Sequence, residues 1–595
     1  MINLGLKRTT RLLQHIGREL FNQSSFDPPW KAVHIAGTNG KGSVAAYLSA
    51  LLQRTIRHKD GSAIRVGRFT SPHFIDRWDC IRINDEAVSQ ELFESTEKQI
   101  KAIGAVVSKE LVEQAADLGE DHNDAISQAQ RHAELTEFEL LTATAFTIFS
   151  QAQPRPCDIT VIECGLGGRL DATNALPDSV IGISVITRIG LDHVDILGGS
   201  IRSIVHEKCG IFRDGAEVIV DEDNSSEVLA AIHEEVLEKY SNDELEGSRE
   251  DRLDDALCHV RHAKGTHIDH YIEKWQEKGK SNAKLQLSVT APSLMNLVPH
   301  QKSNLALAFE VWNVLHEDHA MHADNAILKG LDFCTYPESS PDCIEKVLQD
   351  ATQSYPARLQ MLEGEWLRQA DKAESEFGNV GAASVLLDGA HNEQSAAVLR
   401  DYVDRYTGHA TDQPATRPAN EVVDDEVTSL GHQGADASGS DAVTVHLRSS
   451  DRQIIWILAL SSTKPPTEIL RTLFPPRFRQ EHDAAIQPKE SVIFTTFSPV
   501  DGMPWVKLTP VAILREAAES LDLEVSIQSK SGASNIVEAL QQAETILSTH
   551  KGAPETRPLI VVAGSLYLAS DFLRLQRDGI EKFLQYWGEV HRPTA

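Results

Sequence analysis

The residues with the clearest chemistry lie in the segment AVHIAGTNGKGSVAAYL, residues 32–48. Between a strand-like apolar stretch and a helical pattern stand three glycines, a lysine and a serine: Gly37, Gly40, Gly42, Lys41 and Ser43. Glycines that adopt positive φ let successive N–H groups at a helix N-terminus point at one anion. Lysine adds a positive charge, and serine adds a hydroxyl suited to Mg²⁺. The turn therefore predicts a phosphate-binding loop, although its spacing differs from G-x-x-x-x-G-K-[ST]; the alternative is a glycine-rich turn without a ligand.

Polar side chains also stand where other predicted strands end. Glu163 closes an apolar strand and precedes a glycine turn that carries Arg169 and Asp171, while Asp192 and His193 follow the next strand. Ligands of open α/β sheets bind at the carboxyl ends of the strands, so we expect Glu163 to bind a metal beside the phosphate loop. A single histidine at a strand end is usually structural. Three polar strand ends together favour a functional site.

Four further residues carry weaker signals. Lys208 lies on a predicted helix that ends near Gly210, where a lysine often faces solvent or the helix dipole. Asn304 opens an apolar helical pattern, and its alternative role is a helix N-cap. Asp388 and His391 share a strand-to-helix turn, but no nucleophile lies near them in the sequence.

The elements that must position these residues follow an alternating pattern. Strand-like runs separated by helical patterns predict parallel α/β sheets; the runs are CDITVIECG, VIGISVITRI, AEVIVD, ASVLLDGA, RQIIWILAL, ESVIFTTF and PLIVVAGS. We expect one domain over residues 1–362, with surface additions near 105–133 and 222–285. A second domain is expected over 363–595, with a disordered insertion near 407–443.

Composition narrows the class of protein. A chain of 595 residues exceeds one hydrophobic core, so two or three domains are expected. A net charge of −30 argues against a general nucleic-acid surface or an anionic membrane as partner. Seven cysteines without a C-x-x-C pair indicate a reducing compartment rather than a disulfide framework or a zinc site. No run is long and apolar enough for a membrane span, and the basic N-terminus reads as an amphipathic helix rather than a mitochondrial presequence.

The motifs taken in order resemble the folylpolyglutamate synthase and dihydrofolate synthase family of Mur-ligase-like enzymes. They are GTNGKGS, TSPH (70–73), TEFE (136–139), ECGLGGRLDATN, LDH, HEKCGIFR, HQKSN, PAR (356–358), DGAHN and VVAGSLYL. The resemblance covers most of the chain apart from the three additions. It implies an α/β fold: an N-terminal Mur-ligase-like P-loop ATPase domain with a parallel-rich sheet, and a smaller C-terminal Rossmann-like domain.

The resemblance also implies a reaction and a set of site residues. ATP would convert a pterin-linked carboxylate to an acyl phosphate, which the amino group of L-glutamate attacks. The implied catalytic residues are Lys41, Lys208 and His193. The implied nucleotide contacts are Gly37, Thr38, Asn39, Gly40, Lys41, Gly42, Ser43, Asn304, Arg358, Asp388 and His391. Two Mg²⁺ sites are implied at Ser43, Ser71, Glu163, His193 and a carbamylated Lys208, with a monovalent cation as a further option; the implied pterin contacts are Arg169, Asp171 and Ala172.

Within this family the chain resembles the dihydrofolate synthases. Polyglutamate synthases of eukaryotes usually carry lysine at the position of Asn39 and lack the RLDA sequence present at 169–172. The stretches SPHFIDRWDCIRIND and FSPVDGMPWV resemble fungal monofunctional enzymes, whereas Y-P-A before Arg358 departs from the frequent W-P-G. We therefore expect ligation of L-glutamate to 7,8-dihydropteroate, with polyglutamylation of reduced folates or a bifunctional enzyme as the alternative.

Two other classes of function remain open: a nucleotide-binding regulator that has lost ligation, and a nucleic-acid ATPase, which the charge disfavours. The expected partners are dihydropteroate or a reduced folate and L-glutamate, with no nucleic acid and no membrane. We expect a cytoplasmic monomer, with the mitochondrion as the alternative location.

Overall fold

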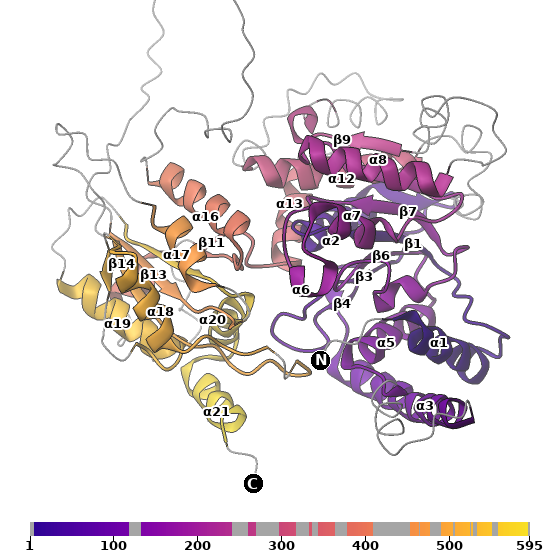
Figure 1. Ribbon diagram of the computed structural model, residues 1–595, viewed down its shortest axis with the longest axis horizontal. Helices are drawn as coiled ribbons and strands as arrows, with labels where there is room; N and C mark the ends of the chain where they lie inside the picture. The colour runs from indigo at the N-terminus through magenta and orange to yellow at the C-terminus, as the bar shows by residue number, and fades with distance from the viewer. Residues whose placement is uncertain are drawn as a thin grey trace, which may run out of the picture.

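The computed structural model describes the parts of the chain given by residues 5–117, 133–240, 260–268, 270, 297–316, 333–335, 343–362, 378–407, 453–462, 465–475, 490–503, 506–523, 525–527, 532–549 and 557–592. Two sheets, each covered by helices, form two halves that lie side by side (Figure 1). Parts of the predicted additions near 105–133 and 222–285, and nearly all of the predicted insertion near 407–443, lie outside the described residues.

The first sheet has eight strands in the order β5-β4-β3-β6-β1-β7-β8-β9. Six of these strands, from β3 to β9 in that order, run parallel, while β4 and β5 are antiparallel at one edge. The bounds are β1 Lys31–Ala36, β3 Val66–Phe69, β4 Ile81–Ile83, β5 Glu86–Ala87, β6 Ile159–Glu163, β7 Ile181–Ile186, β8 Glu217–Asp221 and β9 Val260–Ala263. A separate antiparallel pair joins β2 Ile56–His58 to β10 Phe333–Thr335.

Helices cover both faces of this sheet because its central strands are apolar on both sides. Val33 and Ile35 of β1 face one core with α2, α12 and α13, whereas Ala32 faces a second core with α1, α3 and α5. A third core lies under α7 and α8. The bounds are α1 Leu6–Phe21, α2 Lys41–Thr55, α3 Gln90–Asp117, α5 Glu137–Gln151, η1 Ala172–Ala175, α6 Val194–Leu197, α7 Ile201–Cys209, α8 Ser226–Tyr240, η2 Gly265–His267, α12 Pro299–His316 and α13 Cys343–Ser354.

The second sheet has six strands in the order β11-β12-β16-β13-β14-β15, parallel except for β11. Helices α19, α20 and α21 cover one face, and α16, α17 and α18 cover the other. The bounds are β11 Gln360–Leu362, α15 Gly378–Ala382, β12 Ser384–Leu387, α16 Glu393–Tyr406, β13 Ile454–Leu458, α17 Pro466–Leu473, β14 Glu490–Phe494, α18 Val511–Ser520, β15 Ser526–Ile527, α19 Ile536–Thr549, β16 Leu559–Ala563, α20 Leu566–Asp578 and α21 Ile580–Val590.

The predicted fold class is confirmed: both halves are helix-covered α/β layers with mostly parallel sheets. Each of the seven predicted strand-like runs contains a strand. Because β11 pairs with β12, the second sheet already begins before Leu362; the division of the chain into domains at that residue stays a prediction. Among the described residues, no helix is long and apolar enough to cross a membrane.

Candidate active site

The predicted phosphate loop is a tight connection between β1 and α2. Gly37 and Gly40 adopt positive φ, 150° and 97°, and a side chain at either position would collide with Thr187 or Asn304. The N–H groups of Thr38 and Asn39 donate to the carbonyl of Arg188. Helix geometry leaves the N–H groups of the first turn of α2 without intrahelical acceptors, so these are the groups available to an anion.

The prediction for Gly42 is wrong in one respect. Gly42 is the second residue of α2 and is not among the glycines with positive φ. A Cβ atom at this position would lie 2.1 Å from the hydroxyl oxygen of Tyr355. Glycine is therefore required at this position because α2 packs tightly against Tyr355, not because of backbone conformation.

Two lysines meet at the start of the loop. Lys208 lies on a helix, α7, as predicted, and donates from Nζ to the Gly37 carbonyl at 2.7 Å, while Lys41 Nζ donates to the same oxygen at 3.2 Å. Burial and the positive charge of Lys41 lower the pKa of Lys208 to about 7. The alternative of a solvent-facing lysine at a helix end is excluded, since Lys208 is only 4% exposed.

Glu163 lies beside these cations at the end of β6. Its carboxylate is 3.9 Å from Lys41 Nζ and accepts the N–H of Ser71 at 3.2 Å. Burial raises the pKa of Glu163, while Lys41, Arg358 and Arg68 act in the opposite direction. One buried carboxylate thus stands among three cationic side chains that come from distant parts of the chain.

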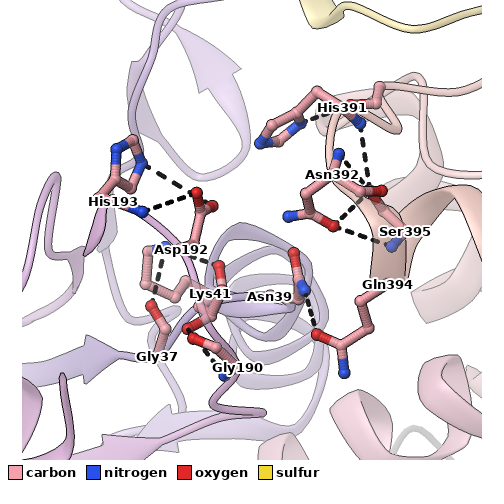
Figure 2. A network of polar contacts seen from close by, with 12 residues as sticks. Gly37, Asn39, Lys41, Gly190, Asp192, His193, His391, Asn392, Gln394 and Ser395 are labelled. Carbon is pink, nitrogen blue, oxygen red and sulfur yellow. Dashed lines mark hydrogen bonds and ion pairs between the residues drawn. The ribbon is translucent and has the colours of Figure 1, made fainter. Parts of the chain in front are cut away.

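The loop after β7 places Asp192 and His193 at the open side of the site. His193 has positive φ (52°), donates its N–H to Asp192 Oδ1, and has Nε2 3.9 Å from Asp192 Oδ2. The side chain of His193 is 48% exposed. Figure 2 shows this loop opposite the turn that carries His391.

Arg358 reaches the site from the segment between α13 and β11. Its guanidinium lies 4.9 Å over the ring of Tyr355 and donates to the Tyr355 hydroxyl at 3.1 Å. The Asp388 carboxylate accepts the N–H groups of Leu359 and Ala390, both at 2.8 Å, so it joins the start of β11 to the end of β12. Burial raises the pKa of Asp388 to about 6, whereas these hydrogen bonds and Arg358 act in the opposite direction.

The turn after β12 faces the phosphate loop. The side chain of Asn392 caps α16, and His391 Nδ1 lies 2.8 Å from the Gly389 carbonyl, which places the proton of a neutral imidazole on Nδ1. Asn39 Nδ2 donates to Gln394 Oε1 at 2.8 Å, and this hydrogen bond crosses from one half of the molecule to the other (Figure 2).

Asn304 lies against the phosphate loop but is not a helix cap. Helix α12 begins at Pro299, so the alternative of an N-cap at Asn304 is wrong. Proline is common at the first position of a helix, where its missing N–H costs nothing. The Asn304 amide lies against Gly40 and packs where a side chain at that glycine would have to be.

The predicted pterin residues lie around the turn after β6. Arg169 pairs with Glu207 at 2.5 Å on the surface. The buried carboxylate of Asp171 caps η1 and accepts from Leu166 N, Thr173 N and Thr173 Oγ1. Ala172 is buried as the first residue of η1. All three residues are close together in the chain, and contact with a pterin stays a prediction.

The predicted metal ligands suit one magnesium ion in chemical type. Mg²⁺ prefers one or two carboxylates together with water and phosphate oxygens, and Glu163 with the hydroxyls of Ser43 and Ser71 offers such a set. Within the described ranges, no group of three or more His, Cys, Asp or Glu side chains is arranged to hold a metal ion. The donors present therefore fit an ion that is held jointly with a bound phosphate rather than by a protein cage.

Two residues of the site escaped the sequence analysis. In the sequence Tyr355 is notable only as the first residue of Y-P-A, which replaces the frequent W-P-G before Arg358. Its packing against Gly42 depends on the tertiary structure. Gln394 lies in the first turn of α16, where nothing in the sequence distinguishes it from a solvent-exposed glutamine.

Comparison with known proteins finds a relative along nearly the whole chain. The family model described as dihydrofolate synthetase, C-terminal domain, matches residues 432–575. The probable dihydrofolate synthetase of Schizosaccharomyces pombe is 27% identical over 96% of this chain and 98% of its own length.

Two solved structures share the fold over nearly the whole chain. Folylpolyglutamate synthase of Mycobacterium tuberculosis, complexed with ADP, has a TM-score of 0.57 at 21% identity and covers 97% of this chain and 95% of its own. The bifunctional folylpolyglutamate synthase/dihydrofolate synthase of Yersinia pestis, complexed with AMPPNP and Mn ion, has a TM-score of 0.52 at 20% identity and covers 97% and 94%.

The fold and the matches define the class: an ATP-dependent ligase with a Mur-ligase-like architecture. Within this class the chain resembles the dihydrofolate synthase and folylpolyglutamate synthase family. The resemblance extends to a fungal dihydrofolate synthetase over almost the entire sequence, as the motifs predicted.

Proposed function

We propose that the protein is a dihydrofolate synthase, which joins L-glutamate to 7,8-dihydropteroate and releases dihydrofolate, ADP and phosphate. The observation that carries the proposal is that Lys41 and Lys208 meet at the Gly37 carbonyl beside the start of α2, with the Glu163 carboxylate 3.9 Å from Lys41 Nζ. The positive charge of Lys41 and a helix N-terminus favour a phosphate group. We infer the substrates from the similarity to the fungal dihydrofolate synthetase, which extends over nearly the whole chain.

The reaction needs an activated carboxyl group because a carboxylate is a poor acylating agent. An oxygen of the dihydropteroate carboxylate attacks the γ-phosphorus of ATP, and the bond to the ADP oxygen breaks. The glutamate amine then attacks the acyl carbon, loses a proton, and expels phosphate as the amide forms. Lys41 donates hydrogen bonds to the transferring phosphoryl group and neutralises its charge.

The metal would be held by Ser43, Ser71 and Glu163, and its chemistry is the neutralisation of phosphate charge. Lys208 is assigned to a second metal site. An amine with a pKa of about 7 is partly neutral at physiological pH, and the neutral amine is the form that adds to CO₂ with loss of a proton. This supports carbamylation of Lys208, which with His193 would give a second magnesium site; a monovalent cation stays a further prediction.

The remaining roles follow the two halves of the molecule. The first half of the molecule binds the nucleotide through the loop residues Gly37 to Ser43 and through Asn304. The second half binds it through Arg358, Asp388 and His391. Arg169, Asp171 and Ala172 contact the pterin. The expected state is a monomer in the cytoplasm, with the mitochondrion as the alternative.

The test is incorporation of labelled L-glutamate with ATP and Mg²⁺. One reaction contains dihydropteroate, and a second contains tetrahydrofolate or its monoglutamyl relatives. Product from dihydropteroate alone establishes a monofunctional dihydrofolate synthase, product from folate alone a polyglutamate synthase, and product in both a bifunctional enzyme. ATP binding without amide formation in either reaction contradicts the proposal and favours the regulator.

A further inference from the structure

A second connection between the two halves lies away from the phosphate loop. The segment 70–79, here called the bridging loop, leaves the end of β3 and returns to β4, and its N–H at Thr70 donates to the Cys80 carbonyl. This loop contains part of the stretch SPHFIDRWDCIRIND. It contacts the second half near another stretch of the sequence, FSPVDGMPWV: Arg77 Nε lies 4.0 Å from Asp501 Oδ2.

The bridging loop is fixed internally by one carboxylate. Asp79 accepts the N–H groups of three consecutive residues, Phe74, Ile75 and Asp76, at 2.5–2.9 Å. The N–H of Asp79 in turn donates to the Asp76 carbonyl. A turn that satisfies four backbone N–H groups in this way holds its shape, so a displacement at Asp76 is transmitted along the loop.

The far side of the loop is held by α20. Arg574 and Arg577 of this helix both pair with the Asp76 carboxylate, at 3.4 Å and 2.5 Å. Arg574 also donates to the Ile75 carbonyl, and Ser570 Oγ donates to the Phe74 carbonyl at 2.5 Å. The Phe74 side chain packs against the core of the second half.

The near side of the loop is held by the first half. Arg77 donates to Glu97 at 2.5 Å and to Glu137 at 3.0 Å, and its guanidinium lies 5.6 Å over the ring of Phe93. Asp76 thus binds the second half, whereas its neighbour Arg77 binds Glu97 and Glu137 of the first half and lies 4.0 Å from Asp501 of the second. The same loop contains Ser71, whose N–H donates to the Glu163 carboxylate in the candidate active site.

We infer that Asp76 is a positioning residue, which couples the docking of α20 to the placement of Ser71 and Glu163. The inference rests on the proposed function, since it assigns a consequence for magnesium binding at that site. When Asp76 is held by the two arginines, the rigid loop keeps Ser71 against Glu163. When the contact is lost, the loop loses both of its ion pairs to α20 and keeps only the backbone contacts of Phe74 and Ile75, the packing of Phe74 and the approach of Arg77 to Asp501 on that side, so the proposed metal ligands are less ordered.

The test compares Asp76→Asn with the matched control Asp578→Asn. Asp578 pairs with the same Arg577 at 2.7 Å but lies on α20 itself and touches no residue of the bridging loop in the contacts described. We expect Asp76→Asn to raise the Mg²⁺ concentration for half-maximal ligation at least about five-fold, with a smaller change in kcat. We expect the control to have the magnesium dependence of the wild type. We expect Asp76→Glu, which keeps the negative charge, to lie close to the wild type as well.

A second measurement needs no catalysis. Hydrogen exchange of the ligand-free protein is expected to be faster at the amides of residues 71–77 in Asp76→Asn than in Asp578→Asn, at equal melting temperature. Identical magnesium dependence and identical exchange in the two variants would overturn the inference. A wild type that makes no dihydrofolate defeats the proposed function instead, and the exchange comparison then still decides whether Asp76 positions the loop.

Discussion

Lys41 and Lys208 donate to one and the same oxygen, the carbonyl of Gly37, at 3.2 Å and 2.7 Å. Two ammonium groups held this close repel each other, and burial together with this repulsion lowers the pKa of Lys208. Negative charge relieves that repulsion, either as a phosphate bound at Lys41 or as a carbamate formed on Lys208. The ligand-free site is therefore already arranged for a negatively charged ligand.

Replacement of Lys41 by methionine tests this arrangement. Methionine keeps most of the side-chain volume of lysine but not its positive charge. We expect the rate of ligation to fall by at least about 100-fold, because the charge of the transferring phosphoryl group is then no longer neutralised. Lys31→Met is the matched control: this lysine begins β1, at the end of the strand opposite the phosphate loop, and donates to the Ser179 carbonyl. A Lys41 variant within a few-fold of the wild-type rate would show that the assigned role is wrong.

Removal of the Tyr355 hydroxyl tests its support of Arg358. In Tyr355→Phe the guanidinium keeps the aromatic face but loses a hydrogen bond to a charged group, worth about 1.5 kcal/mol or more. We expect KM for ATP to rise roughly ten-fold with a smaller change in kcat. Tyr240→Phe serves as control, since that hydroxyl donates to the Arg213 carbonyl away from the site. Equal ATP kinetics in the two variants would contradict the prediction.

The hydrogen bond between Asn39 and Gln394 can be measured by a double-mutant cycle. Steady-state kcat/KM for Asn39→Ala, Gln394→Ala and the double variant is expected to show a coupling of about 0.5–1 kcal/mol, as for a net hydrogen bond between exposed groups. The cycle of Asn39→Ala with Gln585→Ala on the distant helix α21 provides the additive reference. Strict additivity in the first cycle would mean that the two halves are not joined at this point during turnover.

Asp571 predicts a pH dependence of stability. Burial raises the pKa of this carboxyl to about 7, whereas the hydrogen bonds from Ser498 lower it. The folded state therefore binds the proton more tightly than the unfolded state, whose pKa is about 3.8. This contribution to stability is present at low pH and is lost as the pH rises from about 4 to about 7.

Urea unfolding at several pH values checks this sign. The free energy of unfolding of the wild type, relative to Asp571→Asn, is expected to fall across that range by at most about 1.4 kcal/mol per pH unit. Asp501→Asn is the control, because Asp501 is 75% exposed. A difference that is flat or rises with pH would contradict the prediction.

The sequence predicted the strands and the positions at their ends because both depend on local pattern. Long apolar runs made the central strands visible, and Glu163, His193 and Asp388 follow from where those runs stop. The short edge strands β4 and β5, with three and two residues, carry no comparable pattern. These two strands are defined by their antiparallel hydrogen bonding at the edge of the sheet, which a local sequence pattern does not reveal.

The errors and omissions within the site have a common cause. Gly42 is a glycine because Tyr355, far along the chain, occupies the space of its side chain. Asn304 was read as a helix start although Pro299 marks the true one. Contacts across the two halves, such as Asn39 with Gln394, depend on how the sheets meet and leave no trace in local periodicity.

Two of the contacts between the halves differ greatly in strength. The first is a hydrogen bond between exposed amides at the phosphate loop. The second combines a pair of arginines, a serine and a packed phenylalanine around the bridging loop. The contact at Gln394 costs less free energy to break than the contacts at α20, so the edge of the interface beside the phosphate loop separates more readily than the edge beside the bridging loop.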